Sequence, residues 1–72
     1  MLIGKIAVKS RQKILVTIRD VKSIKMIDVR VHTTGDDGEM VATPAGISLL
    51  EEQVDQAIEL LKEAKLRVSA HK

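Results

Sequence analysis

The sequence predicts an α+β fold in which antiparallel strands come first and one amphipathic helix follows. Between residues 13 and 32, apolar and polar residues alternate with the period of two that a half-buried strand requires. From about residue 48 onward, apolar residues recur at the three- and four-residue spacing of a helix with one apolar face. The 72 residues correspond to a single domain, 1–72.

Three strands are expected in the first half of the chain. Residues 2–9 (LIGKIAVK) alternate weakly and end at Ser-Arg-Gln, which indicates a strand followed by a turn. Residues 13–19 and 25–32 each place their apolar side chains on one face and polar, mostly basic side chains on the other. If residues 21–24 form a bend, these two strands pair antiparallel. The apolar residues of the pair are Ile14, Val16, Ile18, Ile27, Val29 and Val31.

A turn and a shorter fourth strand are expected next. Residues 33–39 (TTGDDGE) combine glycines with aspartates that bond their own backbone. Because the acidic residues lack the spacing of a calcium loop, no metal site is expected. A short strand is expected at 39–43, after which Pro44 and Gly46 break the strand pattern.

The C-terminal helix is expected to begin at Ser48-Leu49-Leu50-Glu51, which has the signature of a capping box, and to run to about Val68. Its apolar stripe, expected to pack on the sheet, consists of Leu50, Val54, Ala57, Ile58, Leu61, Ala64 and Val68. Three more leucines, Leu49, Leu60 and Leu66, do not all fit this stripe. With the small size of the chain they suggest a dimer formed through the helices. The alternative is that they are ordinary surface leucines.

Composition argues against several classes of protein. The chain has no cysteine and two histidines, which cannot form a standard structural zinc site. Lys5 interrupts the apolar start, so no signal peptide is expected, and no apolar run approaches the roughly 18 residues of a membrane span. Two distant histidines do not suggest catalysis, so neither an enzyme nor a cofactor is expected. We expect an intracellular protein, in a bacterial or host cytoplasm or in a nucleus, without a membrane partner.

The net charge of +2 hides an uneven distribution of charge. Residues 1–30 carry eight cations and two anions, whereas residues 31–72 carry four cations and eight anions. The basic half is therefore the candidate surface for a polyanionic partner. A solvated sheet face without a ligand is the alternative, because a basic patch is only the electrostatic footprint of a nucleic-acid binder.

Four short motifs at fixed separations carry a resemblance to a known family. They are R-D-x-K at 19–22, I-D-x-R at 27–30, G-E-M at 38–40 and G-I-S-L at 46–49. In this string the chain closely resembles the positive cofactor 4 family of transcriptional coactivators, from about Lys13 to the middle of the helix. The resemblance implies a curved antiparallel sheet, a homodimer paired through its helices, and grooves that bind single-stranded DNA with little sequence preference. It also implies a role in transcription regulation, or in DNA replication and recombination.

The resemblance also implies which residues contact DNA. Arg19, Lys22 and Arg30 match basic positions of the family and are expected to contact phosphates. Lys25 is displaced by one residue from a family lysine. The full set of expected DNA-binding residues is Arg19, Lys22, Arg30, Lys25, Lys13, Arg11 and His32.

The chain departs from the family pattern where bases are expected to stack. Val21, His32 and Thr33 stand where aromatic residues are common, and the chain has no Phe, Tyr or Trp. Pro44 and Ala45 replace a basic pair. Because stacking contributes about 1 to 3 kcal/mol per base, weaker and more salt-sensitive binding is expected. His32 either stacks in part or is an ordinary polar surface residue.

Two alternatives to single-strand binding remain open. One is a dimeric adapter that recruits another protein, such as a transcription or replication protein, with weak DNA binding. The other is a preference for duplex or partly melted duplex DNA, which a basic face alone could support.

Overall fold

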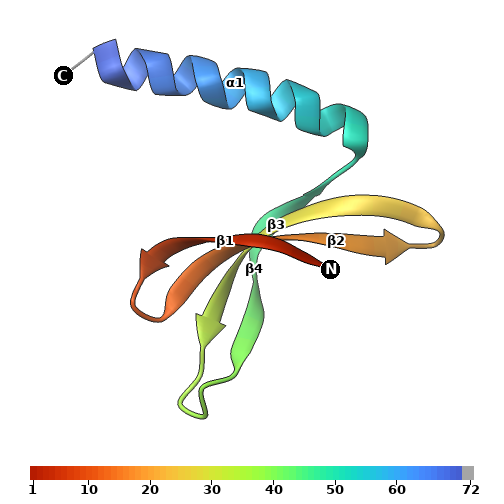
Figure 1. The fold of residues 1–72 in the computed structure, drawn as a ribbon, viewed down its shortest axis with the longest axis vertical. Coiled ribbons are helices and arrows are strands. Elements are labelled where there is room, and N and C mark those ends of the chain that lie inside the picture. Colours follow the sequence, from red (N-terminus) through yellow and green to blue (C-terminus); the bar gives the residue numbers. More distant parts are fainter. Residues whose placement is uncertain (71–72) are drawn as a thin grey trace.

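The computed structural model describes residues 1–70, which form one four-stranded sheet and one helix (Figure 1). The strands are β1 (Leu2–Lys9), β2 (Gln12–Val21), β3 (Ile24–Thr34) and β4 (Met40–Leu49), and the helix is α1 (Glu51–Ala70). The sheet order is β1-β2-β3-β4, and every neighbouring pair is antiparallel. The predicted α+β class and order of elements are confirmed.

β2 and β3 form a hairpin whose turn consists of Lys22 and Ser23. Val21 pairs with Ile24 directly across this turn. Both turn residues have positive φ, 52° and 68°, as a type I′ turn requires. Such a turn follows the right-handed twist of the strands, so the hairpin stays paired up to its tip. The bend predicted at residues 21–24 is confirmed.

β4 is longer than predicted and continues through the two residues that were expected to break it. Between the pairs that β4 makes through Ala42 and through Gly46, three of its residues lie opposite a single residue of β3. Pro44 lies inside this bulge on an edge strand, where the ladder needs no N–H from it. The prediction of a short strand ending at Thr43 was therefore wrong, because the bulge accommodates proline without ending the pairing.

Position 46 requires glycine because β4 approaches β3 closely after the bulge. An ideal Cβ on Gly46 would lie 2.6 Å from the carbonyl oxygen of Val29 and 2.7 Å from Cα of Arg30. Both atoms belong to the backbone of β3, which cannot move aside as a flexible side chain would. The missing side chain is what allows β4 to rejoin the ladder.

The cap of the helix lies two residues later than predicted, at Leu50 and not at Ser48. β4 continues to Leu49, and α1 starts at Glu51. The N–H of Leu50 donates to Oε1 of Gln53 at 2.8 Å, which is the backward half of a capping box with Leu50 at the cap position. Ser48 is not the cap: its hydroxyl donates within the sheet to Asp28, so that prediction was wrong. Within residues 1–70, no helix is both long and apolar enough to cross a membrane.

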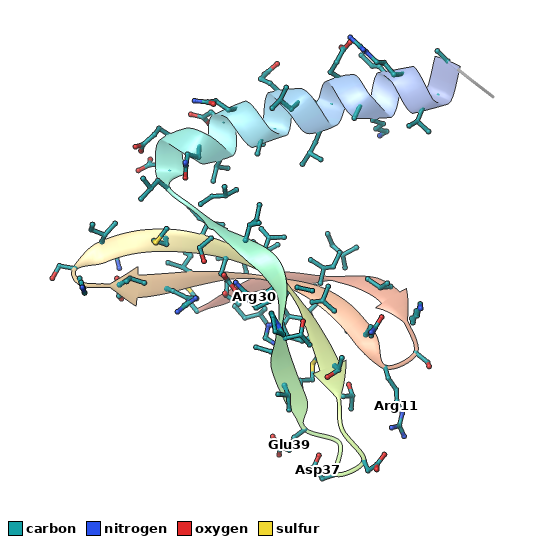
Figure 2. The ribbon with its side chains drawn as sticks, turned by 180° about the vertical axis from the view of Figure 1, so that it is seen from behind. Arg11, Arg30, Asp37 and Glu39 are labelled. Carbon is teal, nitrogen blue, oxygen red and sulfur yellow. The ribbon has the colours of Figure 1, made fainter. Side chains whose placement is uncertain are left out.

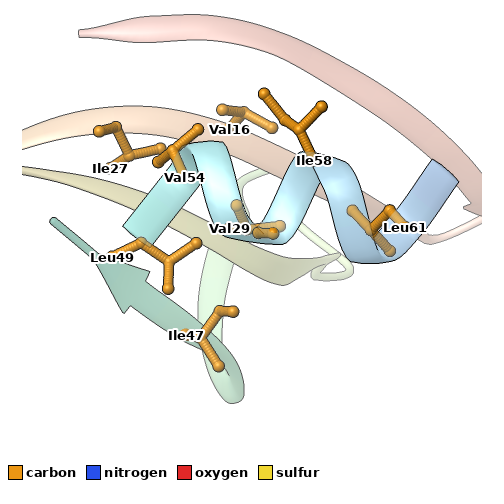
Figure 3. A pocket seen from close by; sticks show the side chains of 9 residues that line it. Val16, Ile27, Val29, Ile47, Leu49, Val54, Ile58 and Leu61 are labelled. Atoms are coloured by element: carbon orange, nitrogen blue, oxygen red, sulfur yellow. The ribbon is translucent and has the colours of Figure 1, made fainter. Parts of the chain in front are cut away.

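The two faces of the sheet differ in character, and α1 turns its apolar stripe toward one of them. A hollow of about 370 Å³ lies between α1 and this face of the sheet (Figure 3). We call this side of the sheet the apolar face. The hollow is lined by Val16, Ile27, Val29, Ile47 and Leu49 from the sheet and by Val54, Ala57, Ile58 and Leu61 from the helix. Val54, Ala57, Ile58 and Leu61 of the predicted stripe thus face the sheet. No residue of α1 is buried, so the expected packing of the whole stripe on the sheet is not found in the single chain.

The single chain leaves most of its apolar surface uncovered. Leu15 is the one buried apolar residue among residues 1–70. The accessible surface is 5966 Å², whereas a compact monomer of this mass exposes roughly 4,400 Å². The radius of gyration is 14.4 Å, against roughly 11 Å for a compact domain of this length. Figure 1 shows the cause: α1 leaves the sheet after β4 and extends beyond it.

Candidate nucleic-acid interface

The face of the sheet turned away from α1 carries charged side chains from three strands. We call it the basic face, after its cationic residues Lys5, Lys13, Arg19, Arg30 and His32. Strand pairing arranges the face in rows. In order along β2, the rows are Ala7, Lys13, His32 and Ala42; Lys5, Leu15, Arg30 and Gly46; Leu2, Thr17, Asp28 and Ser48; and Arg19 with Met26.

A buried carboxylate, Asp28, organises the centre of this face. Its side chain is 5% exposed. It accepts hydrogen bonds from Nε and Nη2 of Arg30, at 3.1 and 3.2 Å, and from the Ser48 hydroxyl at 2.7 Å. The hydrogen bonds from Arg30 hold the pKa of Asp28 below its ordinary value, opposed by burial and helped by Ser48 and the charge of Arg19. Asp28 is therefore an ionised anchor within a basic surface.

Arg30 is held from two sides. Besides its two hydrogen bonds to Asp28, its Nη1 donates to the carbonyl oxygen of Thr43 in the β4 bulge at 2.9 Å. The Thr43 hydroxyl in turn donates to the carbonyl oxygen of Val31 at 2.7 Å, which fixes the bulge. Figure 2 shows Arg30 near the middle of the sheet. Its side chain is 20% exposed.

Arg19 is the more available of the two arginines. Its Nη1 lies 3.7 Å from Oδ1 of Asp28, beyond hydrogen-bond distance, and its side chain is 54% exposed. It can therefore turn toward a ligand without losing a hydrogen bond to Asp28. Lys13 and His32 form a neighbouring pair on β2 and β3, where both are half-buried.

Not all predicted residues reach the basic face. Lys25 lies on the other side of β3, with Ile27, and its Nζ donates to Oδ1 of Asp20 at 3.1 Å. Lys25 therefore does not share the basic face with Arg19 and Arg30. The reason is the period of two along β3, which alternates side chains between faces.

The remaining two predicted residues lie in turns. Lys22 is exposed at the tip of the β2–β3 hairpin. Arg11, which lies in the β1–β2 turn (Figure 2), is paired with Asp36 of the β3–β4 loop, with 2.9 Å between Nη1 and Oδ1. Exposed ion pairs such as this one contribute about 1 kcal/mol or less, so a phosphate can compete for Arg11.

Two residues of the basic face were missed from sequence. Lys5 pairs with Leu15, in the row of Arg30, and only the register of the first hairpin reveals this. Asp28 was recognised as part of a motif but not as the partner of Arg30. The spacing of two residues between them is the signal, since it places both side chains on one face of a strand.

The family model described as Transcriptional Coactivator p15 (PC4) matches residues 8–60. The chain belongs to this family. The PC4 match covers all seven predicted site residues, but it does not reach Lys5.

Solved PC4 structures share the fold. A PC4 homolog from Burkholderia pseudomallei K96243, solved in two crystal forms, has a TM-score of 0.86 and 29% sequence identity to this chain. The similarity covers 90% of this chain and 88% or 96% of that chain, depending on the crystal form.

A bacteriophage T5 homolog of the eukaryotic coactivator PC4, implicated in recombination-dependent DNA replication, has a TM-score of 0.66. The similarity covers 96% of this chain and 88% of the phage protein. At 17% identity it supports the fold alone. No curated protein matches the sequence.

Proposed function

We propose that this chain, acting as one domain, is a non-catalytic homodimer that binds single-stranded DNA without sequence preference. The observation that carries the proposal is the basic face of a chain of the PC4 family, an open sheet surface on which the rows of Lys13 and Arg30 adjoin and Arg19 lies two rows beyond Arg30. Such a protein works inside the cell, in transcription regulation or in DNA replication and recombination. Transcription or replication proteins are its expected protein partners.

The sugar-phosphate backbone is proposed to follow the β2–β3 hairpin. Arg19 and Lys22 are exposed near the tip, and Lys13 and His32 continue the surface toward the opposite end. Each phosphate neutralised releases counterions, which supplies most of the affinity when sequence is not read. Lys25 and Arg11 are proposed as outer contacts, which exchange their exposed carboxylate partners for phosphates.

The homodimer is proposed because the apolar side of the chain needs a cover. The chain exposes roughly 1,500 Å² more than a compact monomer of its mass. This excess is comparable to what one subunit buries in an obligate homodimer, about 1,000 to 2,500 Å². Leu60 and Leu66 of α1 are 70% and 67% exposed, as expected of a helix that meets a second helix. We propose that the helix of a second copy packs against α1 and covers the apolar side of the chain.

Fluorescence anisotropy tests the proposal. A labelled single strand of about 20 bases is titrated with protein at several salt concentrations. We expect binding at low salt that weakens steeply, with a slope in log K against log salt of roughly −0.7 per phosphate contacted. Arg19→Gln should reduce the slope by one such contact, whereas Lys62→Gln on the exposed side of α1 should leave it unchanged.

Competition separates the alternatives. An unlabelled unstructured strand should displace the labelled strand better than a hairpin duplex of equal length. Stronger displacement by the hairpin would establish a duplex preference instead. No binding at low salt would contradict the proposal and favour a protein-interaction adapter.

A further inference from the structure

Arg30 differs from Arg19 in how much of its hydrogen-bonding capacity is already used. A guanidinium has five N–H donors in one plane. Three of the Arg30 donors are engaged, two with Asp28 and one with the carbonyl oxygen of Thr43. The Arg19 guanidinium has no such hydrogen bond to Asp28. Its Nη1 lies 3.7 Å from Oδ1 of Asp28. A phosphate that approached Arg30 in the guanidinium plane would find most of the N–H donors already engaged in hydrogen bonds.

The charge of Arg30 is also compensated. Asp28 lies 3.1 Å from Nε of Arg30 and is held there by burial and by the Ser48 hydroxyl. A phosphate at Arg30 would gain the attraction of the guanidinium and suffer the repulsion of this carboxylate, which nearly cancel at similar distances. An arginine whose charge is already neutralised by such a partner displaces few of the counterions condensed on the DNA, so it adds little to a salt-dependent affinity.

The same contacts fix the plane of the guanidinium. Asp28 holds one edge, and Thr43, on a different strand, holds another. In its row across the sheet, Arg30 is flanked by the buried aliphatic side chain of Leu15 and by Gly46, which has no side chain to cover it. One-fifth of the Arg30 side chain remains exposed. The group is a rigid planar surface of nearly neutral net charge.

A rigid planar guanidinium is a stacking partner for nucleobases. The chain has no Phe, Tyr or Trp, so the planar side chains available to a base on the basic face are guanidinium groups and His32. We propose that Arg30, paired with Asp28, binds an unpaired base through the flat side of its guanidinium and does not serve as a phosphate ligand. This assignment rests on the proposed function, and it replaces the phosphate contact that the sequence motif favoured for Arg30.

Salt dependence distinguishes a base contact from a phosphate contact. For Arg30→Gln, anisotropy titrations with oligo(dA) should give an affinity about five-fold or more below wild type at fixed salt, with the salt slope unchanged. Arg30→Lys should be nearly as weak, because an ammonium group on a flexible stem has no plane to offer. Arg19→Gln should instead reduce the slope by about 0.7, and Arg19→Lys should restore it.

A second measurement needs no variant and therefore does not depend on whether Arg30 variants fold. The Nε–H resonance of Arg30 is followed by NMR in the wild-type protein while oligo(dA), or an abasic strand with the same backbone, is added. We expect an upfield ring-current shift with oligo(dA) and none with the abasic strand. We also expect the abasic strand to bind more weakly with a similar salt slope.

The outcomes separate this inference from the proposed function. Failure of the wild-type protein to bind any single strand would overturn both. Normal binding with a slope reduced by about 0.7 in Arg30→Gln, or the same Arg30 shift with both strands, would overturn the base contact alone.

Discussion

Asp28 accepts hydrogen bonds from two side chains on two strands and lies beside a third, Arg19. It is buried while the cations around it are wholly or partly exposed. Such a carboxylate reduces the mutual repulsion of Arg19 and Arg30, and it holds Arg30 in place. The basic face is thus stabilised in the absence of DNA, but the charge of Arg30 is neutralised by Asp28.

The ionisation of Asp28 predicts a specific loss of stability in acid. Its pKa is lowered by folding, so the ionised form stabilises the fold above the unfolded value of about 3.9, and this contribution is lost as pH falls through the folded pKa. We expect Asp28→Asn to lower the free energy of unfolding at pH 7 by about 1 to 3 kcal/mol. The measurement is urea unfolding of both proteins at one protein concentration, from pH 7 to pH 2. The gap should narrow below about pH 4, and a constant gap would contradict the assignment.

Among the elements, β4 does most to shape the candidate interface. Its bulge directs the Thr43 carbonyl toward Arg30, and Ser48 near its end reaches Asp28. Its proline and bulge also protect an open edge of the sheet from pairing with other strands. β4 therefore both completes the sheet and holds Arg30 and Asp28 on the basic face.

Gly46 provides a test of this close packing. Gly46→Ala places a methyl group against the backbone of Val29 and Arg30, and we expect it to lower the free energy of unfolding by about 1 to 3 kcal/mol. Gly4→Ala is the matched control, because a Cβ at Gly4 meets no atom within 4 Å. It should be neutral or slightly stabilising. Thermal unfolding of the two variants should separate them clearly, and equal midpoints would show that β4 is not held this closely.

At the level of the whole molecule, the chain has two sides with different requirements. The basic face is open to solvent, whereas the apolar face and α1 enclose a hollow that neither fills. A chain with so little buried apolar surface cannot offset the entropy of ordering about 70 residues. The proposed association of two copies would resolve this, because it would cover the helices and leave both basic faces free.

Sedimentation equilibrium tests the association. We expect a mass of twice 7.9 kDa for the wild-type protein. Leu66→Glu on the exposed side of α1 should shift the population to monomer or abolish folding, because a charge would be buried between helices. Glu39→Lys, which also changes a charge but lies in the loop after β3 and not on the helix, should remain dimeric. A wild-type monomer that stays folded at micromolar concentration would contradict the homodimer.

Much of the fold can be inferred from local patterns. Alternation along residues 13–32 identifies two strands and their faces, the helical spacing after residue 48 identifies α1, and four short motifs point to the PC4 family. These inferences succeed because side-chain direction repeats every two residues in a strand and every 3.6 in a helix. A two-residue turn at Lys22 and Ser23 follows from the same register.

The composition of the candidate interface depends on contacts between residues distant in the chain. That Pro44 lies within a strand, that Ser48 bonds Asp28 and caps no helix, and that Lys5 shares a row with Arg30 all follow from pairing with other strands. No local period encodes a bulge or the register of a neighbouring strand, because those are set by hydrogen bonds formed after the sheet assembles. For the same reason, the availability of each cation becomes visible only once its carboxylate neighbours are in place.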